Sequence, residues 1–471
     1  MLFVLPAAGM CVIIIPMQRH NDFTKGPIAG PLILFALPVM GAMILQSLYG
    51  AVDLMIVGKY GSAADVSAVS TGAQIMSTLT QVVVNMAVGV TILLGQFIGA
   101  GRISEAGGII RSGMKLFGTA AALMSVAIPL LAKPLSTVMN APPEAFDRTV
   151  SYVTICGIGF LFIVSYNLLG AVFRGMGDSK TPLLSVAIAA VFNVFGDLWF
   201  VRGMGLGASG AAIATALSQG ISIVICLIVI AKRGLPFSLT SPEAKRLTGI
   251  TGRIVRLGAP IALQGMMVSL SFMVIMAIVN SLGLIYSAGV GVAEKVCSFI
   301  MLISISFSQA ISSFTAQNIG AGNEKRAKDA LLCGMGISFG VSVFIAWFSF
   351  FKGDVLTGMF TSDPELIAAS WDYLRAYAID TLLTSIMFCF VGYFNGCGAT
   401  GFVMMQGIVS AFFVRIPVSW LASRIRPVSL FKIGLATPAS TALQIVLCVV
   451  YYFRRKRQAD RGRENFDIAG D

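Results

Sequence analysis

Six ionisable residues lie inside long apolar stretches of this sequence, where a charge is costly to bury. An ionisable side chain near the centre of a lipid bilayer costs about 2.5–3.5 kcal/mol. Each of these residues is therefore a candidate for a functional role, such as binding an ion, moving a proton or holding a charged cargo. The six residues are Asp53, Asp197, Glu294, Lys295, Asp380 and Arg415.

Two of the acidic residues have a polar partner one helical turn earlier in the chain. Tyr49 precedes Asp53 by four residues and Asn193 precedes Asp197 by four, so each pair shares one helix face. The expected directions of the helices bring both aspartates to the outer half of the membrane, and Thr215 reaches a similar depth from another span. Tyr49, Asp53, Asn193, Asp197 and Thr215 therefore form a candidate site for a cation or a proton.

The residue types of this candidate site suit two driving ions. Carboxylate and amide oxygens are suitable ligands for Na⁺, which Asp53, Asp197 and Asn193 would hold. Two neighbouring carboxylates can instead share a proton, because the repulsion between them favours protonation of one. Either ion could couple a gradient to a conformational change. The alternative is that each aspartate only holds helices together.

The second half of the chain has charges of its own. Glu294 and Asp380 are candidates for substrate binding or ion coupling in that half. Lys295 and Arg415 lie at similar depths, so the alternative interpretation is a network of paired charges with a purely structural role.

The chain contains an internal duplication. Phe173–Ser179 recurs as Phe394–Thr400 and Gln96–Gly101 recurs as Gln317–Gly322, both at an offset of 221 residues. Pro38 and Pro260 are a further matching pair, 222 residues apart. Such repeats are typical of two-lobed transporters with a site between the lobes. The second-half positions that match the candidate site are not acidic, which favours a function over a packing role; they are Ser271, Ile275, Val414 and Val418.

The elements that position these residues are expected to be membrane-spanning helices. Hydrophobic residues make up 56% of the 471 positions and charged residues only 11%. Helices are expected throughout, because lipid offers the backbone no hydrogen-bond partners. Six spans in each repeat, an even number, predict parallel repeats. The predicted spans are 30–57, 65–99, 113–132, 150–173, 182–201, 208–231, 258–282, 287–318, 330–351, 371–394, 402–423 and 434–453.

These spans predict five regions along the chain. The first is an N-terminal segment that is disordered or begins at a start codon placed too early, since Met17 opens a more natural beginning than Met1. Its first sixteen residues are too short to span a membrane and make a poor signal peptide. The predicted regions are that segment (1–26), an N-lobe (27–232), a cytoplasmic linker (233–256), a C-lobe (257–453) and a basic cytoplasmic tail (454–471).

The net charge of +12 does not indicate a nucleic-acid partner. Most Lys and Arg residues fall on segments predicted to be cytoplasmic, mainly Lys232–Arg256 and Arg454–Arg463. This bias is typical of a multi-pass plasma-membrane protein, here with both termini cytoplasmic. The eight cysteines form no CxxC pair and the one histidine is His20. A histidine-based metal centre and an intramembrane enzyme are therefore disfavoured.

The sequence resembles the multidrug and toxic compound extrusion (MATE) family over residues 27–453. The resemblance implies twelve helices in two six-helix bundles, which export cationic, amphiphilic compounds in exchange for Na⁺ or H⁺. It also implies that the five residues of the candidate site form the cation or proton site of the first lobe. A bend near Pro38, which lacks a backbone N–H, would serve as a hinge. The motifs that carry the resemblance are Pro38 with Tyr49 and Asp53, Gln96–Gly101, Phe173–Pro182, Asn193 with Asp197, and Gly210–Thr215.

The sequence therefore predicts an antiporter of the bacterial inner membrane that exports organic cations by alternating access. It is expected to act as a monomer among membrane lipids, with Na⁺ or H⁺ as coupling ion and no other cofactor. The alternative is a flippase for lipid-linked oligosaccharides in the same wider superfamily. That alternative calls for several arginines in the cavity, and Arg415 is the one clear central candidate in the sequence.

Overall fold

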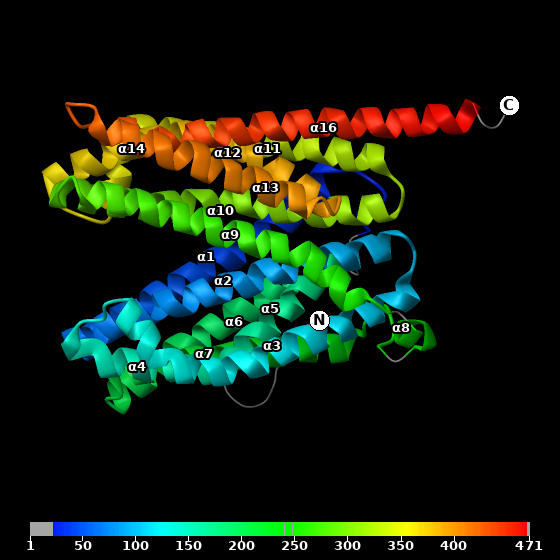
Figure 1. Ribbon diagram of the computed structural model, residues 1–471. Coiled ribbons are helices and arrows are strands. Elements are labelled where there is room, and N and C mark those ends of the chain that lie inside the picture. Colours follow the sequence, from blue (N-terminus) through cyan, green and yellow to red (C-terminus); the bar gives the residue numbers. More distant parts are fainter. Residues whose placement is uncertain (1–21, 240, 247, 469–471) are drawn as a thin grey trace.

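The computed structural model describes residues 22–239, 241–246 and 248–468. Most of the predicted N-terminal segment, including His20 and both candidate start residues, Met1 and Met17, lies outside these residues. The described chain is built from helices that run roughly parallel to one another in two bundles (Figure 1). The prediction of an all-helical membrane protein with two repeats is confirmed.

The lower bundle in Figure 1 is formed by the first half of the chain. Several of its helices follow one another with almost no loop, because the segments that connect them are short and rich in glycine. Its elements are α1 (Ala29–Tyr60), α2 (Ala63–Gly99), α3 (Ile103–Val138), α4 (Pro143–Ile158), α5 (Phe160–Gly175), α6 (Lys180–Asp197), the π-helical turn η1 (Leu198–Gly203) and α7 (Gly207–Arg233).

The upper bundle follows after the short helix α8 (Pro242–Arg246). It begins at Ile250, earlier than the predicted span, and its last helix continues beyond residue 453. Hydropathy marks where a helix leaves the lipid, and a helix can continue past that point into the polar phase. The elements are α9 (Ile250–Asn280), α10 (Leu284–Gly320), α11 (Glu324–Gly358), α12 (Pro364–Gly396), α13 (Thr400–Ser410), η2 (Ala411–Arg415), α14 (Ile416–Arg424), α15 (Leu430–Gly434) and α16 (Ala436–Ile468).

Eleven described helices are each long and apolar enough to cross a membrane, and α4 with α5 would supply a twelfth span. These two helices meet at a bend of 48°. Gly159 lies at the bend, where an added β-carbon would come within 2.7 Å of the β-carbon of Ala216 on α7. The bend therefore allows α4 and α5 to pack closely against α7, a feature that the predicted span 150–173 did not contain.

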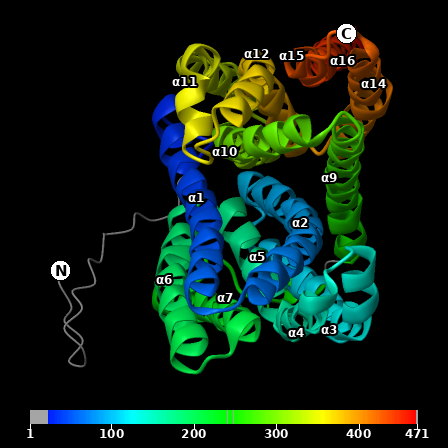
Figure 2. The same ribbon diagram turned by 90° about the vertical axis from the view of Figure 1, so that its left-hand side faces the viewer.

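Two helices connect the lobes, as Figure 2 shows on opposite sides of the molecule. Phe35 and Val39, in the first half of α1, pack in a core cluster with α10 and α12 of the upper bundle. Val57, near the other end of α1, packs in the core of the lower bundle. Helix α9 does the reverse, with Ile254 in the lower core and Ile275 in the upper one. The lobes are therefore mechanically linked through α1 and α9.

The lobes meet through equivalent atoms of the duplicated motif. The Gln96 amide donates to the carbonyl oxygen of Gly396 at 3.0 Å, and the Gln317 amide donates to that of Gly175 at 3.1 Å. Gly99 and Gly320 each bring α2 and α10 so close that a β-carbon would overlap the opposite backbone. We call the part of the molecule that contains these contacts the closed end.

Candidate functional site

The two aspartates of the first half come together in the lower bundle. Asp53 lies on α1 and Asp197 is the last residue of α6, and their side chains are only 4% and 0% exposed. Asn193, one turn before Asp197, is 0% exposed. The helix changes to the π-helical turn η1 directly after Asp197, a distortion that is frequent at functional sites.

The other two predicted members of the site lie beside this group. Thr215 on α7 donates its hydroxyl to Oδ2 of Asp53 at 3.1 Å. Tyr49 interacts electrostatically with Asp53 but accepts a hydrogen bond from the amide of Gln219 at 3.2 Å. Gln219 was not predicted, although it follows Thr215 by one helical turn and so shares its helix face.

Several polar atoms of this group lack a conventional partner. Asp53 lies beside both Asp197 and Asn193. Within the described part of the chain, however, no hydrogen bond reaches Oδ1 of Asp53, either carboxylate oxygen of Asp197 or the amide of Asn193. Buried acceptors without donors are costly. A proton between the carboxylates, or a cation among these oxygens, would satisfy them, so the residues fit either driving ion.

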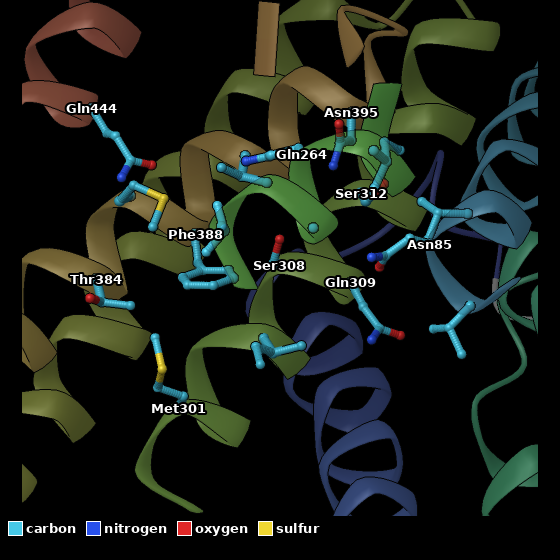
Figure 3. Close-up of a pocket in the computed structure, with 18 of the residues that line it drawn as sticks. Asn85, Gln264, Met301, Ser308, Gln309, Ser312, Thr384, Phe388, Asn395 and Gln444 are labelled. Carbon is cyan, nitrogen blue, oxygen red and sulfur yellow. The ribbon is translucent and has the colours of Figure 1, made fainter. Parts of the chain in front are cut away.

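A second polar region lies in a cavity of about 270 Å³ that is lined by both lobes. Figure 3 shows amide and hydroxyl side chains facing it, including Asn85 from α2, Gln264 from α9, Gln309 from α10 and Gln444 from α16. Phe388 and Met301 supply apolar surface. Among the described residues, neither Asp53 nor Asp197 lines this cavity. The two polar sites are therefore distinct.

The charges predicted in the second half occupy different environments. Asp380 is buried and lines the cavity, and its oxygens accept hydrogen bonds from Thr441 at 2.7 Å and from Thr384 at 2.9 Å. Glu294 is half-buried and Lys295 is exposed. Arg415 is buried and also lines the cavity.

The direct charge pairing considered for these residues is not found. The ion pairs within the described ranges join Arg102 with Glu105, Arg148 with Asp65, Arg233 with Asp178 and Lys328 with Glu324. Glu294, Lys295, Asp380 and Arg415 thus make no contact that would identify them as a structural network of ion pairs.

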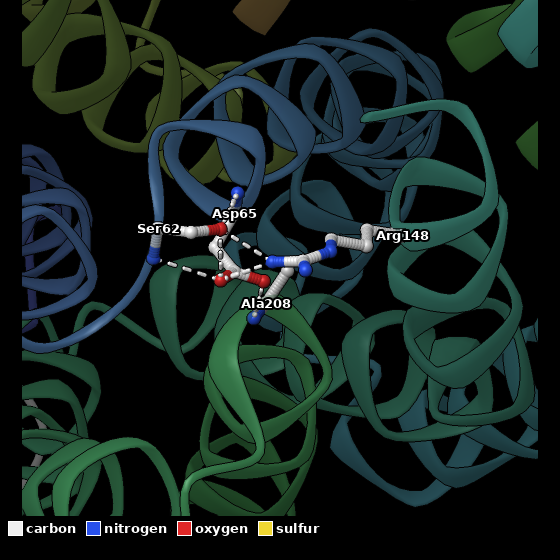
Figure 4. A network of polar contacts seen from close by, with 4 residues as sticks. All are labelled: Ser62, Asp65, Arg148 and Ala208. Atoms are coloured by element: carbon white, nitrogen blue, oxygen red, sulfur yellow. Dashed lines mark hydrogen bonds and ion pairs between the residues drawn. The ribbon is translucent and has the colours of Figure 1, made fainter. Parts of the chain in front are cut away.

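One polar network was missed by the sequence analysis. Asp65, in the first turn of α2, binds the guanidinium of Arg148 on α4 and the backbone N–H of Ala208 on α7 (Figure 4). Its carboxylate also accepts from the hydroxyl and the backbone N–H of Ser62. The network joins three helix ends of the lower bundle. Hydropathy identified Asp65 only as the start of a span, since its partners are distant in sequence.

The chain is similar in sequence to known transport proteins. The sequence model of the MatE family matches residues 38–199 and again residues 260–421, in register with the duplication. A probable multidrug resistance protein, YpnP of Bacillus subtilis, is 29% identical, over 86% of this chain and 91% of that protein. An FAD transporter of Shewanella oneidensis is 23% identical, over 74% of this chain and 78% of its own length.

A solved structure shares the fold. The crystal structure of MATE in complex with MaL6 superposes with a TM-score of 0.87 at 19% sequence identity, and covers 94% of this chain and 100% of that one. The similarity extends over both lobes, so the arrangement of the two bundles is a property of the shared fold.

Proposed function

Because the chain belongs to the MatE family of membrane transporters, we propose that it is a secondary active antiporter. It exports cationic, amphiphilic drugs or toxic organic compounds and imports Na⁺ or H⁺ in exchange. The observation that carries the proposal is the group of Asp53, Asp197 and Asn193, whose buried acceptors lack donors within the described residues. A transported ion would satisfy those acceptors on each cycle.

Helix α1 connects the ion site mechanically to the other lobe. Asp53 lies on the part of α1 inside the lower bundle, whereas Phe35 and Val39 pack against the upper bundle. Pro38 stands between Phe35 and Val39, within the part of α1 that packs against the upper bundle, and leaves one helical hydrogen bond unmade. Ion binding at Asp53 would therefore alter the position of α1 against both lobes, with Pro38 as hinge.

The cargo would bind in the cavity between the lobes, separately from the ion. Its amides, hydroxyls and aromatic side chains suit amphiphilic molecules of varied shape. Asp380 lines the cavity and would face a cationic group, whereas Glu294 is not among the described residues that line it. Ion and cargo need not touch, because antiport requires only that each binds the two conformations with different affinity.

The proposed setting is the bacterial inner membrane, with both termini in the cytoplasm and the protein acting as a monomer among lipids. This orientation assigns the closed end to the cytoplasmic side, because α2 and α10 end there. The contacts of Gln96 and Gln317 would then seal the cytoplasmic side, and the structure would correspond to an outward-facing state.

The test is dye-cation transport in reconstituted vesicles with a Na⁺ gradient or a pH gradient imposed separately. The intact protein is expected to move the dye under at least one gradient, and Asp53→Asn is expected to abolish that dependence. Asp147→Asn is the matched control, since Asp147 is exposed and lies on α4, outside the three helices that carry the ion site. Undiminished gradient-driven transport by Asp53→Asn would contradict the assigned ion site and direct attention to Glu294 and Asp380.

A second candidate function has one observation in its favour. The cavity lining contains Arg174 as well as Arg415, and guanidinium groups suit the phosphates of a lipid-linked oligosaccharide. If the folded protein moves no dye under either gradient, the lipid-linked cargo becomes the better hypothesis, and flipping of a fluorescent lipid-linked sugar is the next measurement.

A further inference from the structure

The charge in the cavity has an unexpected sign for an exporter of simple cations. The charged residues that line it, among those described, are Arg174, Asp380 and Arg415. Two guanidinium groups therefore accompany one carboxylate. A cargo that carries a negative group as well as a positive one would therefore match this lining better than a cargo that carries only positive charge.

The burial and the contacts of Arg415 are those expected of a residue that binds a ligand. It is the last residue of the π-helical turn η2 and is only 5% exposed. Its Nη1 donates to the hydroxyl of Ser271 at 3.2 Å, and the guanidinium lies over the ring of Phe272 at 4.6 Å from the centroid. Its Nε has no hydrogen-bond partner in the described part of the chain. The planar group is thus held in position with a donor left free.

The nearby carboxylate does not account for this arginine. Both oxygens of Asp380 accept hydrogen bonds from threonine hydroxyls, and within the described ranges it makes no ion pair with Arg415. Asp380 acts on Arg415 only at longer range. A buried guanidinium without a direct anionic partner is costly, and an anion from outside the chain would relieve that cost.

Further donors face the same cavity. The hydroxyls of Ser312, Ser313 and Thr437 are buried and have no hydrogen-bond partner in the part of the chain that the structure describes. Hydroxyl donors and a guanidinium together are the groups that bind carboxylates and phosphates.

We propose that Arg415 binds an anionic group, a carboxylate or a phosphate, on the cargo. The preferred cargo is then an amphiphilic molecule with a negative group at Arg415, a positive group toward Asp380 and an apolar body against Phe272. This inference rests on the proposed export function and defines the chemical class that the exporter takes. The alternative role of Arg415 is structural, as a group that only holds Ser271 and covers Phe272.

The test uses two dyes that differ in one group. Tetramethylrhodamine carries a free carboxylate beside its cationic ring system, and its methyl ester is a simple cation of nearly the same shape. Binding of each to the purified full-length protein in neutral micelles is measured by fluorescence anisotropy. The native protein is expected to bind the free acid more tightly than the ester. Equal or tighter binding of the ester by the native protein overturns the proposal, and this comparison needs no variant.

Substitution of Arg415 tests its role directly. In Arg415→Gln the preference for the acid over the ester is expected to fall by about 10- to 100-fold, the range for one hydrogen bond between charged groups. Arg415→Lys keeps the charge and should retain part of the preference. Arg424→Gln is the matched control, because Arg424 is exposed and lies over Trp420 in the same lobe. Equal weakening of both dyes in Arg415→Gln indicates the structural role and contradicts the proposal.

The same assay distinguishes between two sources of the anionic group, the cargo itself and the phosphate of a membrane lipid. Phosphatidylglycerol added to the micelles should compete with the free acid in the native protein if a lipid phosphate reaches Arg415, and phosphatidylcholine at the same mole fraction serves as the reference. Because binding is measured without any gradient, failure of ion-coupled transport in vesicles leaves this result intact, and the two proposals can fail independently.

Discussion

Alanine at Gly99 or Gly320 should force the closed end apart. A β-carbon on Gly99 would overlap the backbone carbonyl oxygen of Gln317, and one on Gly320 would overlap that of Gln96. Neither obstacle is a flexible side chain, so α2 and α10 must separate by on the order of 1 Å to restore ordinary contact. This penalty applies only to the conformation in which the closed end is formed.

The magnitude follows from the cost of overpacking. A clash of this kind costs about 1–3 kcal/mol. The ratio of closed-end to separated conformations should therefore fall by about 5- to 150-fold in either single variant. The two substitutions act on one helix crossing, so the double variant should shift the ratio by less than the sum of the single effects. The equivalence of the two repeats further predicts that both single variants have similar effects.

The assay is a distance measurement across the closed end. Spin labels are placed at the equivalent exposed positions Ser104 and Lys325, after the native cysteines have been replaced. Gly118→Ala is the control, because Gly118 is helical and nothing lies within 4 Å of its added β-carbon. A short-distance population that is unchanged in both Gly99→Ala and Gly320→Ala would refute the reasoning, as would an equal shift in Gly118→Ala.

Two further substitutions test the lower bundle. Asp65→Asn removes the ion pair with Arg148 and should lower the free energy of unfolding by about 1–3 kcal/mol, seen as a lower melting temperature in detergent; an unchanged melting temperature would show that the network is not stabilising. Thr215→Val removes the hydroxyl that donates to Asp53 and should change the concentration of driving ion needed for half-maximal transport by about 5- to 10-fold. Thr137→Val, at an exposed hydroxyl on α3, should leave that concentration unchanged, and an equal change in both variants would count against a role for Thr215.

Much of the fold was predictable because the lipid environment imposes a simple pattern. Long apolar runs between charged and glycine-rich clusters located the spans, but several helices extend well beyond the predicted ends, as α3 does by beginning at Ile103 and not at residue 113. The bend at Gly159 and the π-helical turns η1 and η2 were not predicted, since they depend on packing against neighbouring helices and leave no periodic signal. The early start of α9 at Ile250 was missed for a related reason, because a helix can begin in a basic polar segment.

The candidate ion site was predictable to the extent that it depends on spacing along one helix. Asp53 and Asp197, each with a residue one turn away, stood out as costly residues in apolar runs, and the structure brings them together. Gln219 was missed because its partner Tyr49 lies 170 residues away, and only the rotation of α7 makes them face each other. Arg174 was identified only as part of the duplicated motif Phe173–Ser179, and its place in the cavity lining depends on how the two lobes meet.

The combination of symmetric and asymmetric features bears directly on the antiport proposal. The contacts that join the lobes are equivalent, with Gln96 and Gln317 exchanging hydrogen bonds across the duplication. The polar sites are not equivalent, since the lower lobe holds two carboxylates and the upper lobe holds Asp380 with Arg415. A symmetric interface allows the lobes to close and separate as two similar bodies. Unlike ligands can then be exchanged because the ion and the cargo bind at different sites, and divergence of a few residues after the duplication accounts for that difference. The proposal accordingly predicts that loss of Asp53 removes ion dependence while dye binding persists, and that loss of Arg415 changes cargo preference while ion dependence persists.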